Sequence, residues 1–177
     1  MSVNALRRKM PVIVVPRYAQ ASEVPQIAAL YHAIWHETHA RFMPEQECAR
    51  RDIAFFHDRM AMLQPATLVV AHDRAIVGFA AWHDDVLSQV FVASARRGTG
   101  LASRLMSAAE REMAGHGVSL AKLHCVVGND RARSFYERHG WAVLEQFVDP
   151  KTGRPDGVPF WRMVKHLSNH SSNHRGS

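Results

Sequence analysis

The most informative segment of this 177-residue sequence reads Val90-Phe91-Val92-Ala93-Ser94-Ala95-Arg96-Arg97-Gly98-Thr99-Gly100-Leu101-Ala102. A β-branched and aromatic run leads through two arginines into two glycines, after which Leu101, Leu105, Ala109 and Met113 recur at helical spacing. The segment therefore predicts a strand, a tight turn and a helix that begins at the glycine pair.

The predicted helix start has the properties of an anion site. A helix N-terminus leaves backbone N–H groups unpaired and carries a partial positive charge, and glycine leaves the approach to those groups open. Arg96 and Arg97 add guanidinium groups that can donate charge-assisted hydrogen bonds to phosphate oxygens. We interpret the segment as a cradle for a pyrophosphate group. The alternative is a tight turn whose arginines are merely solvated.

Two other phosphate-binding motifs do not fit this segment. A P-loop requires Lys and Ser/Thr after its second glycine, where this chain has Leu101 and Ala102. The dinucleotide fingerprint requires a third glycine, where Ser103 stands. The chain therefore belongs to neither class by motif.

Composition indicates one ordinary globular domain. Hydrophobic residues make up 47% of the chain and charged residues 21%, and we expect a single domain over residues 11–167 with flexible tails at 1–10 and 168–177. Two cysteines are too few for a disulfide framework, and no apolar run reaches membrane-spanning length. We therefore expect a cytoplasmic protein without membrane contact. The net charge of +6 favours an anionic ligand, but the basic residues are spread along the chain, so no nucleic-acid partner is expected.

The order of predicted elements indicates an α/β fold. Hydrophobic periodicity predicts helices that begin near residues 24, 44, 101 and 131, the second of them continuing to Met60. Strands are predicted over residues 12–15, 67–71, 76–82, 86–92, 120–127, 141–147 and 160–164, with a long hairpin loop at 151–159. A strand, a crossover helix and another strand imply at least one parallel pair inside an otherwise antiparallel sheet.

A second segment, Asn129-Asp130-Arg131-Ala132-Arg133-Ser134-Phe135-Tyr136-Glu137-Arg138-His139-Gly140-Trp141, follows about 30 residues later. With it the chain resembles the GCN5-related N-acetyltransferases (GNAT), whose cofactor is acetyl-coenzyme A. The first segment resembles their Gln/Arg-x-x-Gly-x-Gly/Ala pyrophosphate loop, although Ala95 stands where Gln or Arg is usual. The second resembles their Asn-x-x-Ala-x-x-x-Tyr segment with its Gly-aromatic pair. The resemblance implies a GNAT-like acyl-CoA N-acyltransferase fold. This fold is a twisted, mostly antiparallel sheet with one parallel pair, a V-shaped cleft and helices on both faces.

The resemblance also implies roles for matched residues. The backbone of Val90, Phe91 and Val92 would bind the pantetheine arm and polarise the thioester carbonyl. The pyrophosphate would be held by Arg96, Arg97, Gly98, Thr99, Gly100, Leu101 and Ala102. Asn129 would border the cofactor, and Tyr136 would act as general acid near its sulfur. A hydroxyl within hydrogen-bond reach of a leaving thiolate suits that role.

The general base is less clearly indicated. Some relatives place a glutamate five residues before the motif asparagine, where this chain has His124. Imidazole titrates near neutral pH and is chemically suited to take a proton from an amine. Asp85, in a predicted turn, is an alternative, as is an ordered water. Alternation along the strand could aim Gln89 at the acceptor.

Several residues between 32 and 42 are candidates for acceptor binding. His32, His36 and His39 share one helical face, but no carboxylate or cysteine pattern completes a zinc site, so we expect no metal. The resembled family builds its acceptor pocket partly from this region, so Trp35, His36 and His39 could contact substrate. Packing beneath the sheet is the alternative.

These observations favour an N-acetyltransferase that moves an acetyl group from acetyl-CoA to a primary amine by direct attack in a ternary complex. The amine could belong to a small molecule or a protein, because the segments 32–45 and 150–160 carry no diagnostic motif. The competing hypothesis is a non-catalytic acyl-CoA sensor or scaffold domain. Dimerisation is common in the resembled family, so a homodimer is possible.

Overall fold

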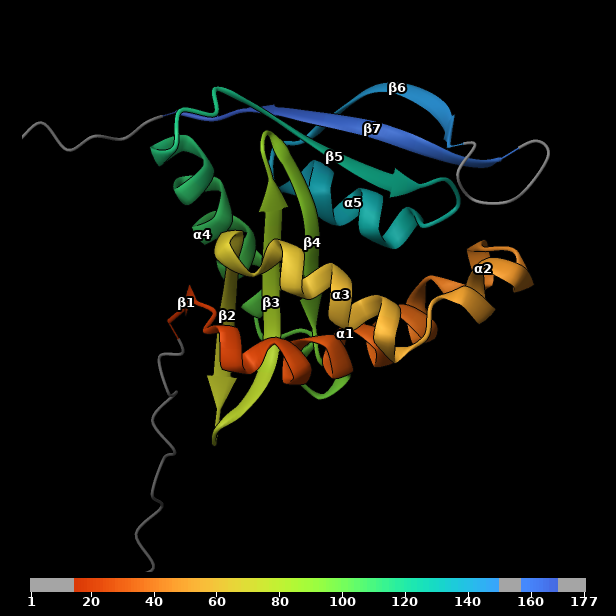
Figure 1. Ribbon diagram of the computed structural model, residues 1–177. Helices are drawn as coiled ribbons and strands as arrows, with labels where there is room; N and C mark the ends of the chain where they lie inside the picture. The colour runs from red at the N-terminus through yellow and green to blue at the C-terminus, as the bar shows by residue number, and fades with distance from the viewer. Residues whose placement is uncertain (1–14, 150–156, 169–177) are drawn as a thin grey trace, which may run out of the picture.

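The computed structural model describes residues 15–149 and 157–168 (Figure 1). Its strands are β1 (Arg17–Tyr18), β2 (Thr67–His72), β3 (Ala75–His83), β4 (Val86–Val92), β5 (Leu120–Val126), β6 (Ala142–Asp149) and β7 (Val158–His166). Its α-helices are α1 (Val24–Thr38), α2 (Glu45–Arg50), α3 (Ile53–Leu63), α4 (Leu101–Gly115) and α5 (Asp130–Arg138).

The seven strands form one mixed sheet in the order β1-β2-β3-β4-β5-β7-β6. Neighbouring strands are antiparallel except β4 and β5, which are parallel and are joined through α4. A parallel pair requires such a crossover, because the chain must return to the end of the sheet where the first strand begins before the second strand can run in the same direction. The predicted fold class, a mostly antiparallel twisted sheet with one parallel pair, is confirmed.

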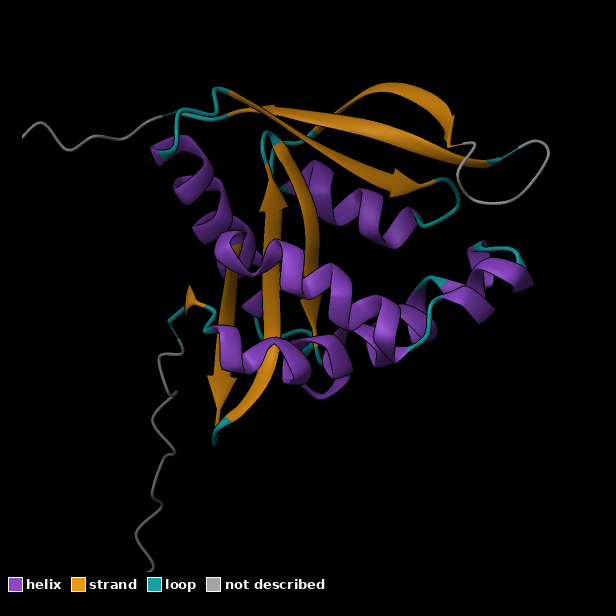
Figure 2. Cartoon of the chain, in the orientation of Figure 1, coloured by secondary structure: helices purple, strands orange, loops and turns teal. Residues whose placement is uncertain are grey.

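Helices cover both faces of the sheet (Figures 1 and 2). Successive side chains of β3 point to opposite faces, so Phe79 and Ala81 pack with α1 and α3, while Ala80 and Trp82 pack with α4. The α5 residues Phe135 and Tyr136 pack against the same core as α4. The molecule therefore has two apolar cores, which we call the α1/α3 layer and the α4/α5 layer.

The helix predicted from residue 44 to Met60 is wrong as a single element. It is divided into α2 and α3, because the side chain of Asp52 caps a new helix: its Oδ1 accepts a hydrogen bond from the Phe55 backbone N–H at 2.9 Å. The division leaves Arg51 between the two helices, with a φ of −90° and a ψ of 60°.

Several predictions fall on parts of the chain outside the described residues. These include the tail at 1–10, nearly all of the tail at 168–177 and most of the 151–159 loop. The strand predicted at 12–15 also lies there except for Val15, which is not in a strand, and β1 follows Pro16. Within the ranges 15–149 and 157–168, no helix is both long and apolar enough to cross a membrane.

Candidate active site

The strands β4 and β5 pair only at one end and then separate. Their ladder consists of a single pair, Val86 opposite Lys122, supported by a hydrogen bond from the Lys122 N–H to the Asp85 carbonyl at 2.8 Å. Beyond this point β5 pairs with β7 along its length, while β4 pairs with β3. Figure 2 shows the two strands diverging. The backbone of β4 from Leu87 to Val92 therefore makes no ladder with β5 in the described part of the chain.

A bulge in β4 lies where the separation begins. Ala81 is opposite Gln89 and Trp82 is opposite Leu87, so Ser88 is an extra residue without a partner in β3. A bulge bends its strand and increases the local twist. The segment that would bind pantetheine, Val90 to Val92, follows directly and so lies in the separated half of the strand.

The open end of β4 leads into a bare helix start. The N-cap residue of α4, Gly100, has a φ of 78°, and Gly98 has a φ of 75°, a region that side-chain-bearing residues rarely adopt. A Cβ built on either glycine meets no atom within 4 Å, and no side chain caps the helix. The first backbone N–H groups of α4 therefore have no side-chain cap, and no side chain at Gly98 or Gly100 blocks the approach to them, as the sequence predicts for an anion cradle.

The two arginines of this turn differ in their surroundings. Arg97 donates a hydrogen bond from Nη1 to Oε1 of Glu37, near the end of α1, at 2.6 Å. The Nη2 atom of Arg97 is buried without a hydrogen-bond partner in the described chain. Hydrogen bonding to Arg97 lowers the pKa of Glu37, with smaller coulombic contributions from Arg97 and Arg131. Arg96, half-buried, ends the short 3-10 turn Ser94–Arg96.

The second motif, residues 129–141, forms α5 and its two ends, and it contacts the first turn of α4. Asn129 caps α5, and its side chain accepts a hydrogen bond from the Ala132 N–H at 3.2 Å, so this side chain has a structural role. His139 at the end of α5 lies 2.9 Å from the Ser103 hydroxyl through Nε2, which ties α5 to α4. The two predicted motifs are therefore brought together in space.

Tyr136 lies on the α4/α5 side of β5. Burial raises the pKa of its phenol strongly, and the neighbouring Cys125 adds to the shift. In the part of the chain that the structure describes, its hydroxyl makes no hydrogen bond. The Tyr136 hydroxyl is therefore held in its protonated form and is available as a donor.

His124 lies on the opposite face of the same strand. It is exposed, two residues beyond Lys122, and its ring meets that of Phe147 edge-on at 4.8 Å between centroids. It is directly opposite Arg162 in β7. The predicted acid, Tyr136 of α5, and the predicted base, His124 of β5, therefore lie on opposite faces of β5.

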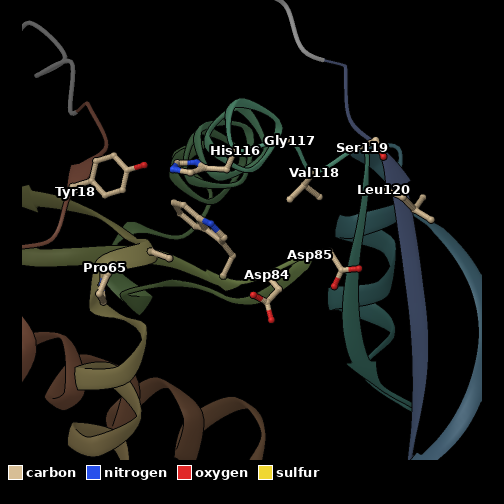
Figure 3. Close-up of a pocket in the computed structure, with 11 residues that line it drawn as sticks. Tyr18, Pro65, Asp84, Asp85, His116, Gly117, Val118, Ser119 and Leu120 are labelled. Atoms are coloured by element: carbon tan, nitrogen blue, oxygen red, sulfur yellow. The ribbon is translucent and has the colours of Figure 1, made fainter.

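Asp85 is placed elsewhere. Its carboxylate forms an ion pair with the Lys122 ammonium at 2.6 Å, at the closed end of the strand pair. It borders a hollow of about 670 Å³ between the β3–β4 turn and the loop after α4 (Figure 3). Trp82, His116 and Ser119 also line this hollow. The structure therefore does not bring Asp85 to Tyr136 and the glycine turn.

Two of the predicted acceptor residues, Trp35 and His39, pack together at the end of α1. Trp35 is only 3% exposed and belongs to the α1/α3 core, and its ring is parallel to that of His39 at 6.3 Å. The His39 ring meets Phe91 of β4 at 5.4 Å. Burial, followed by the charges of Arg51 and Arg41, lowers the pKa of His39 to about 4.

The remaining two acceptor candidates contact polar groups of the α1/α3 layer. His36 Nε2 lies 2.9 Å from the Arg51 carbonyl oxygen. Gln89 faces the buried Tyr31, whose hydroxyl also interacts with Arg59. Within the described ranges, His, Cys, Asp and Glu side chains form no group of three that could hold a metal. His32 and His36 instead pack ring against ring at 4.5 Å.

Sequence reasoning did not identify Glu37, Arg51 or Arg59 as site residues. Glu37 is distant from Arg97 in sequence, and no local pattern indicates that contact. Asp52 was the available signal for the position of Arg51. An aspartate that caps a helix marks the helix start, so the chain breaks before it and Arg51 lies at that break.

The fold is similar to that of solved N-acetyltransferases. A GCN5-related N-acetyltransferase from Rhodopseudomonas palustris has 20% identity and a TM-score of 0.70, over 87% of this chain and 96% of that one. The PaiA N-acetyltransferase from Thermoplasma acidophilum, in complex with coenzyme A, has 15% identity and a TM-score of 0.69, over 87% and 99%. YncA from Salmonella typhimurium, with its cofactor acetyl-CoA, has 19% identity and a TM-score of 0.64, over 92% and 99%.

The architecture is thus the fold of the GCN5-related N-acetyltransferases. The acetyltransferase (GNAT) family profile matches residues 27–141, well over half of the chain, and the chain belongs to this family. Comparison with curated protein sequences gives no match. Family membership supports acetyl transfer in general and acetyl-CoA as the cofactor. The open space at Gly98 and Gly100 and the unpartnered Arg97 Nη2 fit a phosphate-bearing cofactor.

Proposed function

We propose that this protein transfers an acetyl group from acetyl-CoA to a primary amine by direct attack in a ternary complex. The observation that carries this proposal is the separation of β4 from β5 after the single pair Val86–Lys122, with the bare N-terminus of α4 at the open end. The gap exposes strand N–H groups for a thioester carbonyl, and the helix start supplies N–H groups for a pyrophosphate.

Each wall of the gap has a defined task in this proposal. Acetyl-CoA, when bound, supplies the activated thioester. The backbone of Val90 to Val92 binds its pantetheine arm and stabilises negative charge that develops on the carbonyl oxygen. Arg96 and the turn from Gly98 to Ala102 hold the pyrophosphate, and Arg97 joins them when Glu37 releases it.

Tyr136 acts as the general acid. Because burial raises the pKa of Tyr136 far above neutral, the phenol remains protonated and can donate to a leaving thiolate at any physiological pH. This face of β5 also carries Cys125, whose thiol has a pKa raised by burial to about 12 and is therefore a poor nucleophile.

His124 takes the proton from the amine, directly or through an ordered water. Its exposed position in the separated half of β5 supports this role over that of Asp85, which is paired with Lys122 at the closed end. An ammonium has no lone pair for attack, so this proton must leave first.

The direct test is release of free thiol from acetyl-CoA with a panel of primary amines. Tyr136→Phe is expected to lower kcat by about 100-fold or more. Tyr18→Phe is the matched control, because Tyr18 donates its hydrogen bond to Glu112 and lies at the closed-end hollow. Coenzyme binding without thiol release for any amine would instead favour a sensor or scaffold domain.

His124→Gln separates the two base candidates. We expect it to remove the acidic limb of the pH–rate profile, whereas Asp85→Asn should leave that limb in place. The opposite result would assign the base to Asp85, and an unchanged profile in both variants would assign it to water.

A further inference from the structure

Arg51, which caps the C-terminal end of α2, has an unusual environment. Its guanidinium carbon lies 4.8 Å from the centroid of Trp35 and 5.1 Å from that of Phe55. Its Nε atom is buried and has no hydrogen-bond partner in the described part of the chain. A buried donor without an acceptor is uncommon in folded proteins and points to a missing partner.

The ion pair between Arg51 and Glu47 does not satisfy the hydrogen-bond donors of the Arg51 guanidinium. Glu47 Oε2 lies 3.6 Å from Arg51 Nη2, beyond normal hydrogen-bond length, while Glu47 Oε1 bonds Arg50 at 3.1 Å. The backbone of Arg51 is nonetheless held in place, because its carbonyl oxygen contacts the His36 ring. The guanidinium is thus positioned but only partly neutralised.

Ring contacts connect this guanidinium to the separated half of β4. Trp35, beneath Arg51, is parallel to His39, and His39 meets Phe91 of β4. Arg51 is therefore on the α1/α3 side of the strand segment assigned to the thioester. The contacts of Arg51 with Trp35 and Phe55 are distinct from the ion pair of Arg97 with Glu37 in the glycine turn.

The charges around this position are mainly positive. Arg41 and Arg51 both act on His39, and Arg59 and Arg51 both act on the Tyr31 hydroxyl. Arg41 and Arg59 make no ion pair with a described residue. Of the nearby carboxylates, Glu47 is shared by two arginines and Asp52 is used as the α3 cap.

We propose that the acceptor is an amine that also carries a carboxylate, as an amino acid does, and that Arg51, assisted by Arg59, binds that carboxylate. This inference rests on the proposed function. A planar guanidinium matches a carboxylate through two parallel hydrogen bonds, and the free Nε is one member of its donor pair. The same positive charge disfavours the ammonium form of the acceptor and disfavours polyamines, which bring only positive charge.

Matched acceptors test the charge requirement. We would compare kcat/KM for free L-amino acids with that for their α-carboxamides, and for 2-aminoethyl phosphate with that for ethanolamine. The free acids should exceed their amides by about tenfold or more, mainly through KM. Equal kcat/KM values for the acids and their amides would overturn the proposal. If 2-aminoethyl phosphate exceeded ethanolamine while acids and amides stayed equal, the site would bind a phosphate and the assignment to a carboxylate would be wrong.

Matched variants test the residue. Arg51→Gln should lower kcat/KM for the preferred acid by about tenfold and leave its amide within about twofold, and Arg59→Gln should act in the same direction. Arg50→Gln is the control, because Arg50 shares Glu47 but is 65% exposed. Equal effects of Arg50→Gln and Arg51→Gln would overturn the role of Arg51.

A binding measurement distinguishes failure of this inference from failure of the proposed function. Thiol release with no amine at all, despite coenzyme binding, would reject the proposed function. Calorimetric titration of the coenzyme A complex with N-acetyl-L-amino acids and their amides then measures binding at the carboxylate site without requiring turnover. Binding of the acids that is lost in Arg51→Gln, but kept in Arg50→Gln, is expected. Absence of binding by the acids would overturn the inference.

Discussion

Arg97 and Glu37 join the turn before α4 to the end of α1 through a 2.6 Å ion pair that spans 60 residues of sequence. The contact links a residue expected to bind phosphate with the layer that carries Trp35 and His39. A phosphate oxygen and the Glu37 carboxylate would compete for the same guanidinium, since both are acceptors of charge-assisted hydrogen bonds.

Removal of the Glu37 charge should therefore favour the coenzyme. Glu37→Gln is expected to tighten coenzyme A binding roughly two- to fivefold in calorimetry at low salt, because Arg97 no longer has a competing carboxylate. Acetyl-pantetheine, which lacks the pyrophosphate, should bind equally to both proteins. Glu23→Gln, which breaks the comparable Arg17–Glu23 pair, is the control and should leave coenzyme affinity unchanged. Weaker binding by Glu37→Gln would contradict the competition.

Alanine substitutions in the glycine turn should affect both the stability of the protein and its affinity for coenzyme A, whereas a similar substitution elsewhere should affect stability alone. Gly98, Gly100 and Gly117 all have positive φ and open space around a built Cβ, but Gly117 lies beyond the other end of α4. Alanine at any of them should lower the free energy of unfolding by about 1–2 kcal/mol. Only Gly98→Ala and Gly100→Ala should also weaken coenzyme A binding, by about tenfold. Equal affinities in all three variants would show that the turn does not bind the pyrophosphate.

His39 should make the fold sensitive to acid. The folded protein keeps this ring neutral down to a pKa of about 4, whereas the unfolded chain protonates it near 6.5, so unfolding takes up a proton between these values. The free energy of unfolding should therefore fall as the pH drops from 6.5 towards 4. The contribution of His39 is at most about 3 kcal/mol.

Urea unfolding at pH 7.5 and pH 4.5 measures this effect. His39→Gln should lose less stability than wild type between the two conditions, while His57→Gln, at a half-exposed site in α3, should follow wild type. An unchanged pH dependence in His39→Gln would mean that the ring titrates normally in the folded state.

The two cysteines should differ in reactivity. Burial raises the pKa of Cys125 to about 12, so almost no thiolate is present at pH 8, whereas Cys48 is only partly buried. A disulfide reagent such as DTNB should modify one thiol rapidly in the native protein, and Cys48→Ser should abolish that phase. A rapid phase that persists in Cys48→Ser would assign reactivity to Cys125.

Local patterns made the cofactor side of the fold predictable. The β4 strand, the glycine turn and the start of α4 follow directly from alternation, backbone conformation and helical spacing within about 25 residues. The predicted ranges of β2, β3 and β5 agree with the structure to within one residue at each end for the same reason.

Long-range contacts could not be read from the sequence. The Arg97–Glu37 pair and the position of Arg51 over Trp35 depend on how α1 docks beside β4, which is set by packing of Tyr31 and Phe79 rather than by neighbours in the chain. The break between α2 and α3 was missed because the apolar spacing of residues 44 to 60 outweighed the capping signal of Asp52.

The two apolar cores share the strands of the sheet but use alternate side chains of them, as Phe79 and Ala80 show. Replacement of residues on one surface of a strand therefore leaves the packing on its reverse nearly intact. Descendants of a common ancestor can consequently remodel the half that contains α1 and α3 while inheriting the other half without change.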